Sequence, residues 1–131
     1  MGKKKKKEQE PEGIKRIAEN RRARHDYAIT ETFEAGMELR GTEVKSLRNR
    51  NVHFESAYAM IKNGEAYLIG LTIDPFKYGT HENHEPDRTR RLLLHRREIA
   101  RIEKLTREKG TTLIPLKLYF KHAWAKVLLG I

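Results

Sequence analysis

Alternation of hydrophobic and polar residues is clearest around the middle of the chain. Residues 58–62 and 65–69 are two β-favouring runs on either side of Asn63-Gly64. Asn-Gly favours the tight type I′ turn of β-hairpins, because both of its residues tolerate a positive φ. We therefore predict a hairpin here, with a second strand that continues until Pro75 interrupts it.

Three further stretches have strand-like patterns. Residues 27–33 alternate between large apolar and small or polar side chains, and Gly36 then permits a turn. The apolar runs 114–120 and 124–129 near the end of the sequence are separated by a few turn-forming residues. These segments predict one more strand before the central hairpin and two after it.

Two helices are predicted. The first covers 42–48, where Thr42 is a suitable N-cap and apolar residues recur three apart. The second includes 99–105, has a narrow apolar stripe, and can end at Gly110 in a left-handed cap. Between them, 77–91 lacks periodicity and predicts a long loop, a feature that is usually functional or mobile.

Five or six strands linked by hairpins predict a mainly β protein. Closing so small a sheet removes its exposed edges, so we expect an OB-type antiparallel β-barrel with flanking helices. Residues 14–131 would form this single domain. Residues 1–13 have almost no apolar side chains and are expected to be a disordered basic arm, or alternatively a solubilising tail.

The net charge of +10 is concentrated in two segments. Residues 1–25 carry a net +6 and residues 86–110 a net +5, whereas the rest of the chain carries −1. Clustered positive charge binds phosphates through counterion release. A polyanion is therefore the expected partner, although part of the charge on the second helix can be an ordinary solvated face.

Composition also bounds the chemistry. The 131 residues include no cysteine, which excludes disulfides, thiolate metal ligands and cysteine nucleophiles. No apolar run approaches the length of a membrane span, and no secretory leader is visible. We expect a cytoplasmic protein with no membrane partner and no cofactor, and we expect it to be a monomer.

Two arginine-rich segments have the chemistry of an RNA contact. Residues 20–25 combine an amide, three guanidiniums and an imidazole, and Asn20 could read a base edge or hold a sugar hydroxyl. Residues 88–95 set three arginines against three leucines, which suggests that the leucines enter the core while the arginines face outward. Solvated basic linkers remain the alternative for both segments.

Catalysis has weaker support. Residues 81–87 contain two histidines and three carboxylates, but their spacing does not fit a helical zinc motif, and Pro86 argues against a helix. We find no phosphate-binding loop and no nucleophile elbow, so we expect neither a metal site nor an enzyme. Trp124 and the tyrosines could stack on bases, although aromatics at strand spacing are more often core.

The signature blocks of this sequence resemble those of the small protein B family, also called SsrA-binding protein. The matching blocks run in order along most of the chain: 20–27, 34–36, 41–48, 83–84, 88–95, 98–99, 124–127 and Gly130. The resemblance implies an OB-type barrel with flanking helices that binds the tRNA-like domain of transfer-messenger RNA. It also implies support for alanylation of that RNA and delivery to stalled ribosomes for rescue and peptide tagging. The implied partners are that RNA, the stalled ribosome, and, through the RNA, elongation factor Tu and alanyl-tRNA synthetase.

The same resemblance assigns RNA-facing positions. His95 departs from members with Asn there, though either side chain can donate a hydrogen bond. We predict that Glu34 accepts hydrogen bonds from a base edge or orients a neighbouring arginine, which adds specificity. The complete set is Asn20, Arg21, Arg22, Arg24, His25, Glu34, Lys45, Arg48, Arg88, Arg90, Arg91, Leu93, His95 and Lys126.

Competing hypotheses are a general ribosomal or single-strand RNA binder and an OB-scaffold hydrolase that uses residues 81–87.

In the family a basic tail follows the position of Gly130, whereas this sequence stops at Ile131. We therefore expect binding of the RNA and support of alanylation, but no peptide tagging on stalled ribosomes.

Overall fold

A computed structural model describes residues 12–54, 56–79 and 83–131 of the chain. The basic arm predicted for 1–13 lies outside these residues except for its last two. The elements in order are β1 (Ile14–Glu19), α1 (Arg21–Asp26), β2 (Thr32–Met37), α2 (Gly41–Arg48), β3 (Val52–His53), β4 (Tyr58–Lys62), β5 (Glu65–Ile69), β6 (Thr72–Ile73), β7 (Arg90–Leu93), α3 (Arg96–Lys109), β8 (Ile114–Lys121) and β9 (Trp124–Gly130).

Seven of the strands form one antiparallel sheet in the order β1-β8-β9-β2-β7-β5-β4. The sheet curls back on itself, because an isolated antiparallel bridge joins Ala59 of β4 to Leu113, which directly precedes β8. The Ala59 amide donates to the Leu113 carbonyl at 2.9 Å. Strands β3 and β6 form a separate two-stranded ladder. This curled antiparallel sheet agrees with the predicted OB-type architecture.

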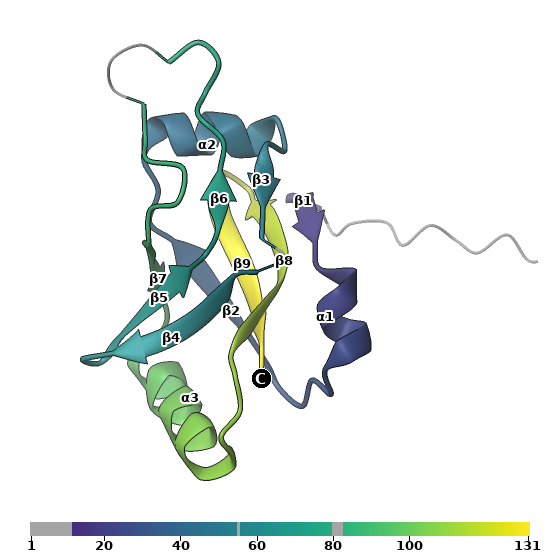
Figure 1. Cartoon of the computed structure of the whole chain (residues 1–131), viewed down its shortest axis with the longest axis vertical. Helices are drawn as coiled ribbons and strands as arrows, with labels where there is room; N and C mark the ends of the chain where they lie inside the picture. Colours follow the sequence, from purple (N-terminus) through teal and green to yellow (C-terminus); the bar gives the residue numbers. More distant parts are fainter. Residues whose placement is uncertain (1–11, 55, 80–82) are drawn as a thin grey trace, which may run out of the picture.

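The helices lie around the sheet rather than within it. Helix α2 crosses one end of the molecule, α3 lies at the opposite end, and α1 lies to one side beside β8 (Figure 1). Among the described residues, no helix is both long and apolar enough to cross a membrane.

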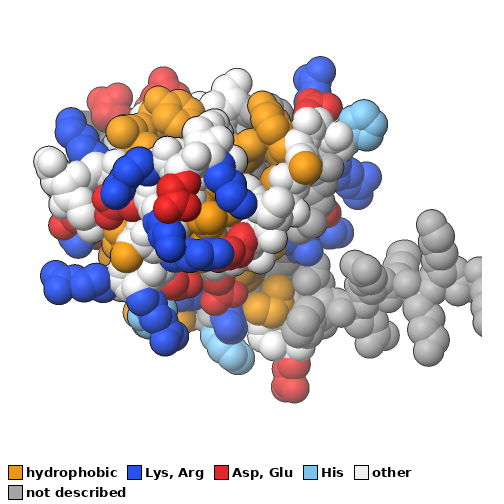
Figure 2. Space-filling model, turned by 90° about the horizontal axis from the view of Figure 1, so that it is seen from below, with side chains coloured by type: hydrophobic (Ala, Val, Ile, Leu, Met, Phe, Trp, Pro, Cys, Tyr) orange, Lys and Arg blue, Asp and Glu red, His pale blue; other side chains and the backbone are white. Residues whose placement is uncertain are grey.

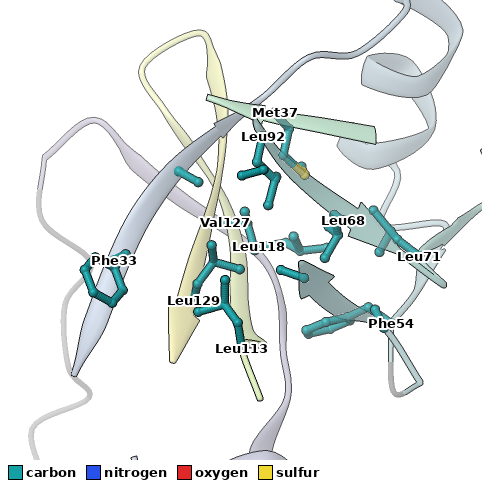
Figure 3. Packing of buried hydrophobic residues seen from close by; sticks show 14 of the residues in the cluster. Phe33, Met37, Phe54, Leu68, Leu71, Leu92, Leu113, Leu118, Val127 and Leu129 are labelled. Atoms are coloured by element: carbon teal, nitrogen blue, oxygen red, sulfur yellow. The ribbon is translucent and has the colours of Figure 1, made fainter. Parts of the chain in front are cut away.

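The core fills the inside of the curled sheet (Figure 3). Leu68, Leu118, Val127 and Leu129 are fully buried there and come from three different strands. Along β5 and β7, buried residues alternate with more exposed ones, as in a sheet with one face on the core. Strand β8 is buried over most of its length, because Ala23 of α1 packs against its Ile114 and Leu116. Helix α3 contributes Ile102 and Leu105 from its apolar stripe.

Several predicted elements are confirmed. The central hairpin turns at Asn63 and Gly64, with φ values of 52° and 76°, as a type I′ turn requires. Helices α2 and α3 are present where the sequence predicts them, and α3 ends at Gly110 with φ 60°. The predicted N-cap of α2 was wrong, because the helix begins at Gly41 and Arg40, not Thr42, is its N-cap. Strands β8 and β9 pair as a hairpin.

Other predictions were wrong. The strand expected over 27–33 begins only at Thr32, and Gly36 does not turn the chain but pairs with both Leu93 and Lys126 inside the sheet. Strand β1 and helix α1 were missed because the charged residues in both hide their short apolar patterns. Ile17 and Ala23 are the core anchors of these two elements.

Candidate nucleic-acid interface

The outward face of the main sheet carries a compact group of charged, aromatic and apolar side chains. We define the outer sheet patch as Glu34 of β2, Leu93 of β7, Tyr119 and Lys121 of β8, and Lys126 of β9. Register brings them together: Gly36 pairs with both Leu93 and Lys126, and Lys126 pairs with Tyr119. A Cβ atom added to Gly36 would lie 3.4 Å from Leu93 Cβ and 3.7 Å from Lys126 Nζ, so these two side chains flank the glycine.

Glu34 is the centre of this patch. Its Oε2 accepts a short hydrogen bond from the Tyr119 hydroxyl, and its Oε1 lies 3.3 Å from Lys121 Nζ. The Tyr119 bond, helped by Lys121 and Lys126, outweighs partial burial and holds the pKa of Glu34 below its ordinary value. Burial and the bond to Glu34 raise the pKa of Tyr119 in turn. Glu34 is therefore an oriented carboxylate whose neighbours are a tyrosine and lysines, not the arginine that the sequence suggested.

A groove of about 370 Å³ extends from the patch toward α2. Its lining includes Leu93, Lys126 and Trp124. Trp124 is 72% exposed and Leu93 is 52% exposed, so the expectation that Trp124 belongs to the core was wrong. An indole, an aliphatic side chain and an ammonium around one groove can hold the face of an unpaired base beside its phosphate.

Helix α1 carries the first arginine-rich segment as a fixed structure. It is anchored by Ala23, which packs against Ile114 and Leu116 of β8. Arg21 and Arg22 are exposed, and the side chain of His25 is 88% exposed beside Asp26. Arg24 lies in this helix, but its side chain is outside the described set. The segment for which a solvated linker was the alternative is thus a helix, from which Arg21, Arg22 and His25 project into solvent.

Asn20 has a different position from the one expected. Its side chain is buried and caps α1, with Oδ1 accepting from the Ala23 amide at 3.1 Å. Its Nδ2 is 3.5 Å from the Pro115 carbonyl. An amide engaged in this way positions the arginines of α1. Its contact with RNA, to a base edge or a sugar hydroxyl, stays a prediction.

Two further predicted residues lie on α2. Lys45 and Arg48 are both exposed, three residues apart on one helix, as expected. The Lys45 ammonium lies 5.4 Å from the centroid of the Phe76 ring. This helix therefore presents its cations at the end of the molecule opposite α3 (Figure 1).

The second arginine-rich segment divides between the inside and the outside of the sheet. Arg90 is fully buried and Arg88 is mostly buried, and both bind the fully buried Glu43 of α2. We call these three residues the buried ion cluster. Arg90 Nε donates to Glu43 Oε2 at 2.7 Å and its Nη1 to the Leu71 carbonyl at 2.5 Å, while Arg88 Nη2 lies 2.5 Å from Glu43 Oε1.

The ionisation of the buried ion cluster follows from these contacts. Burial alone would raise the pKa of Glu43, but hydrogen bonds from Arg88, the Arg40 amide and Arg90 outweigh it, and the net shift is downward. Burial lowers the pKa of Arg90 against the attraction of Glu43. The expectation that the arginines face outward and the leucines inward was therefore wrong for Arg90 and for Leu93. Strand alternation places Arg90 and Leu92 inside and Arg91 and Leu93 outside.

The remaining predicted residues are exposed at the sides of the sheet. Arg91 pairs with Glu65 of β5 at 3.1 Å. His95 stands at the start of α3, where its amide donates to Glu98 Oε1 at 2.9 Å. Sequence reasoning missed Tyr119 and Lys121, although a two-residue turn in the last hairpin would have set Tyr119 opposite Lys126.

His84, the described histidine of residues 81–87, makes contacts that stabilise the fold. His84 is buried, with Nδ1 2.9 Å from Thr42 Oγ1 and Nε2 2.8 Å from the Ile73 carbonyl. His81 and Glu82 lie outside the described residues. Within 12–54, 56–79 and 83–131, no group of three or more His, Asp or Glu side chains is arranged to hold a metal ion.

The face at the α3 end has mixed charge. Figure 2 shows Lys and Arg side chains there interspersed with Asp and Glu, with apolar side chains between them. Arg101 of α3 forms an ion pair with Glu31, with 3.0 Å between the charged atoms. Mixed charge fits the solvated-face alternative for α3 better than a phosphate-binding surface.

Comparison with known proteins gives the same picture along nearly the whole chain. The family model described as SmpB protein matches residues 17–131. The SsrA-binding protein of Lactiplantibacillus plantarum is 50% identical over 115 residues, covering 88% of this chain and 74% of that protein. The SsrA-binding protein of Pelotomaculum thermopropionicum is 54% identical over 118 residues, covering 90% and 77%. A solved structure described as "tmRNA-SmpB: a journey to the center of the bacterial ribosome" matches with 53% identity and a TM-score of 0.71, covering 86% of this chain and 80% of that one. The chain belongs to the SmpB family.

Proposed function

We propose that this chain binds transfer-messenger RNA, the SsrA RNA, and acts with it on ribosomes in trans-translation and ribosome rescue. The observation that carries the proposal is the outer sheet patch, where the oriented Glu34 carboxylate lies among lysines and near the exposed Leu93. Phosphate attraction alone would not use a carboxylate, whereas recognition of a particular folded RNA can use one as a hydrogen-bond acceptor. Relatives about half identical to this chain bear the name SsrA-binding protein.

Two surfaces divide the work of binding in this proposal. The exposed cations of α1, with Lys45 and Arg48 of α2, attract the phosphate backbone. The outer sheet patch and the adjoining groove supply contacts that depend on the shape and bases of the tRNA-like domain. Arg88 and Arg90 act from inside, by holding α2 against β7.

The same proposal includes the cellular location and oligomeric state of the chain, its support of alanylation, and the partners that it reaches through the RNA. The chain acts as a cytoplasmic monomer whose role is binding rather than catalysis. It supports alanylation of the RNA and reaches alanyl-tRNA synthetase and elongation factor Tu through the RNA. Alanylation rates of the RNA with and without the protein address this part directly.

The decisive experiment is a binding titration with transfer-messenger RNA and with an unstructured RNA of equal length, each at several salt concentrations. We expect clear preference for transfer-messenger RNA. Equal affinity for both would favour a general single-strand RNA binder instead.

A variant with Arg21, Arg22 and Arg24 all changed to Ala tests the phosphate-binding role of α1. Alanine is the best helix former, so α1 should remain folded. We expect weaker binding and a salt dependence flatter by about two to three in log–log slope, because each lost phosphate contact removes about 0.7–0.9. An unchanged slope in a correctly folded variant would show that α1 is not part of the interface.

A further inference from the structure

A second aromatic site lies apart from the outer sheet patch, in the loop that follows β6. Tyr78 in this loop is 75% exposed, the largest exposed fraction among the large hydrophobic side chains of the described residues. Its ring contacts Phe76 edge-on, with centroids 5.6 Å apart and an interplanar angle of 71°. The Tyr78 ring is therefore exposed to solvent and packs against the Phe76 ring.

Cations surround these two rings. The Lys45 ammonium of α2 lies 5.4 Å from the Phe76 centroid, and the Lys77 ammonium lies 5.7 Å from the Tyr78 centroid. Asp74 is a nearby acidic residue in the sequence, and its carboxylate is 3.5 Å from the His53 imidazole of β3. The immediate surroundings of the rings are therefore positive.

Hydrogen bonds tie Phe76 to Asn83. The Phe76 amide donates to Asn83 Oδ1 at 3.0 Å, and Asn83 Nδ2 donates back to the Phe76 carbonyl at 2.9 Å. Gly79 permits this closure, since a Cβ atom there would lie only 2.6 Å from Asn83 Nδ2. Because these bonds already fix the backbone of Phe76, ligand binding costs less conformational entropy there than it would at an unrestrained aromatic residue.

We propose that Tyr78 and Phe76, flanked by Lys45 and Lys77, form a stacking site for an unpaired nucleotide of the bound RNA. The exposed Tyr78 ring is the stacking surface for the base, and Phe76 supports it edge-on. The ammonium groups of Lys45 and Lys77 lie over the two rings and can pair with the phosphates that flank the base. A hydrophobic protein partner would gain nothing from the lysines, so an unpaired nucleotide fits this surface better. The inference rests on the proposed RNA-binding function and adds a contact at the α2 end of the molecule.

The first test compares affinities for transfer-messenger RNA of the wild type, Tyr78→Ala, Tyr78→Phe and the control Tyr58→Ala. Tyr58 is another exposed tyrosine, at 43%, but lies on β4. Loss of one base–aromatic stack should weaken binding by about tenfold in Tyr78→Ala, whereas Tyr78→Phe keeps the ring and should stay within about twofold. The salt dependence of Tyr78→Ala should equal that of the wild type, because stacking releases no counterions.

The second test reads the contact directly. In a Trp124→Phe background, Tyr78→Trp introduces the only indole of the chain. Because Trp124 lines the groove, the affinity of this double variant is measured first, and the RNA is added well above its Kd. Saturating transfer-messenger RNA should quench its fluorescence as a base stacks on it. Unquenched emission, or wild-type affinity in Tyr78→Ala, would overturn the stacking site and leave a protein partner as the better explanation of the loop. Failure of the wild type itself to bind the RNA would instead refute the proposed function, so the two failures are distinguishable.

Discussion

Two carboxylates in this molecule, Glu43 and Glu34, both accept hydrogen bonds from cationic side chains, but one is buried and the other is partly exposed. Glu43 lies in the buried ion cluster with Arg88 and Arg90, and no part of its side chain reaches solvent. Glu34 lies in the outer sheet patch, with 37% of its side chain exposed beside Lys121. Each has a pKa below its ordinary value because donors surround it.

Burial, rather than residue type, separates the carboxylate that stabilises the fold from the one that a ligand can reach. Glu43 has all its donors inside the protein and holds α2 against β7. Glu34 has donors on one side and an open side toward solvent, where a ligand can complete its hydrogen bonds. The arginines of a basic signature block can therefore belong to the scaffold even in an RNA-binding protein.

The largest effect is expected from breaking the buried ion cluster. Glu43→Gln removes the negative charge and leaves Arg90 buried without its counter-ion. We expect the free energy of unfolding to fall by about 3–5 kcal/mol, the usual range for breaking a buried pair. Urea denaturation at pH 7 measures this, with Arg91→Ala as the exposed control, for which a loss below about 1 kcal/mol is expected. Similar losses in the two variants would contradict the distinction between inside and outside.

Acid should affect the two carboxylates unequally. Because the folded pKa of Glu43 lies below its ordinary value of 4.5, its contribution to stability is complete above that value and is lost as pH falls through the folded pKa. Unfolding free energies measured from pH 7 to pH 3 should therefore decline less steeply in Glu43→Gln than in the wild type. Glu34→Gln should flatten the decline much less, since solvent screens its partners. A larger flattening in Glu34→Gln would reverse the comparison.

Glu34→Gln should instead change RNA selectivity. Replacing a charge-assisted hydrogen bond by a neutral one costs about 1 kcal/mol, which would reduce the preference for transfer-messenger RNA over unstructured RNA by about fivefold. Tyr119→Phe is the matched variant, because it frees the carboxylate without removing it. Paired titrations with both RNAs measure the ratio. Equal tightening toward both RNAs in Glu34→Gln would mean that the carboxylate only repels phosphate.

The smallest effect is expected at the α3 end. Arg101 and Glu31 form an exposed ion pair, and Glu31 raises the pKa of Arg101. We expect Arg101→Ala to leave both the free energy of unfolding and the RNA affinity essentially unchanged, because solvent screens an exposed pair. A marked loss of affinity would place α3 within the interface.

Local patterns predicted those parts of the fold whose determinants are local. The hairpin at Asn63 and Gly64 and the cap at Gly110 depend on backbone conformations that only a few residue types adopt. The partner of Arg90 could not be predicted in this way, because Glu43 lies on a helix distant in the sequence and meets it only when the sheet is assembled. Likewise the sequence could not predict the contact between Tyr119 and Glu34, because it depends on β9 lying between β8 and β2 in the sheet.

That position of β9 also constrains the order in which the sheet can be assembled. Strand β2 lies between β7 and β9, and β1 pairs with β8, so neither early strand has its sheet neighbours until much later residues have been synthesised. The hairpin of β4 and β5 needs only adjacent residues and can form at once. During synthesis, β1 and β2 therefore leave the ribosome with unpaired edges, and their hydrogen bonds wait for the last hairpin.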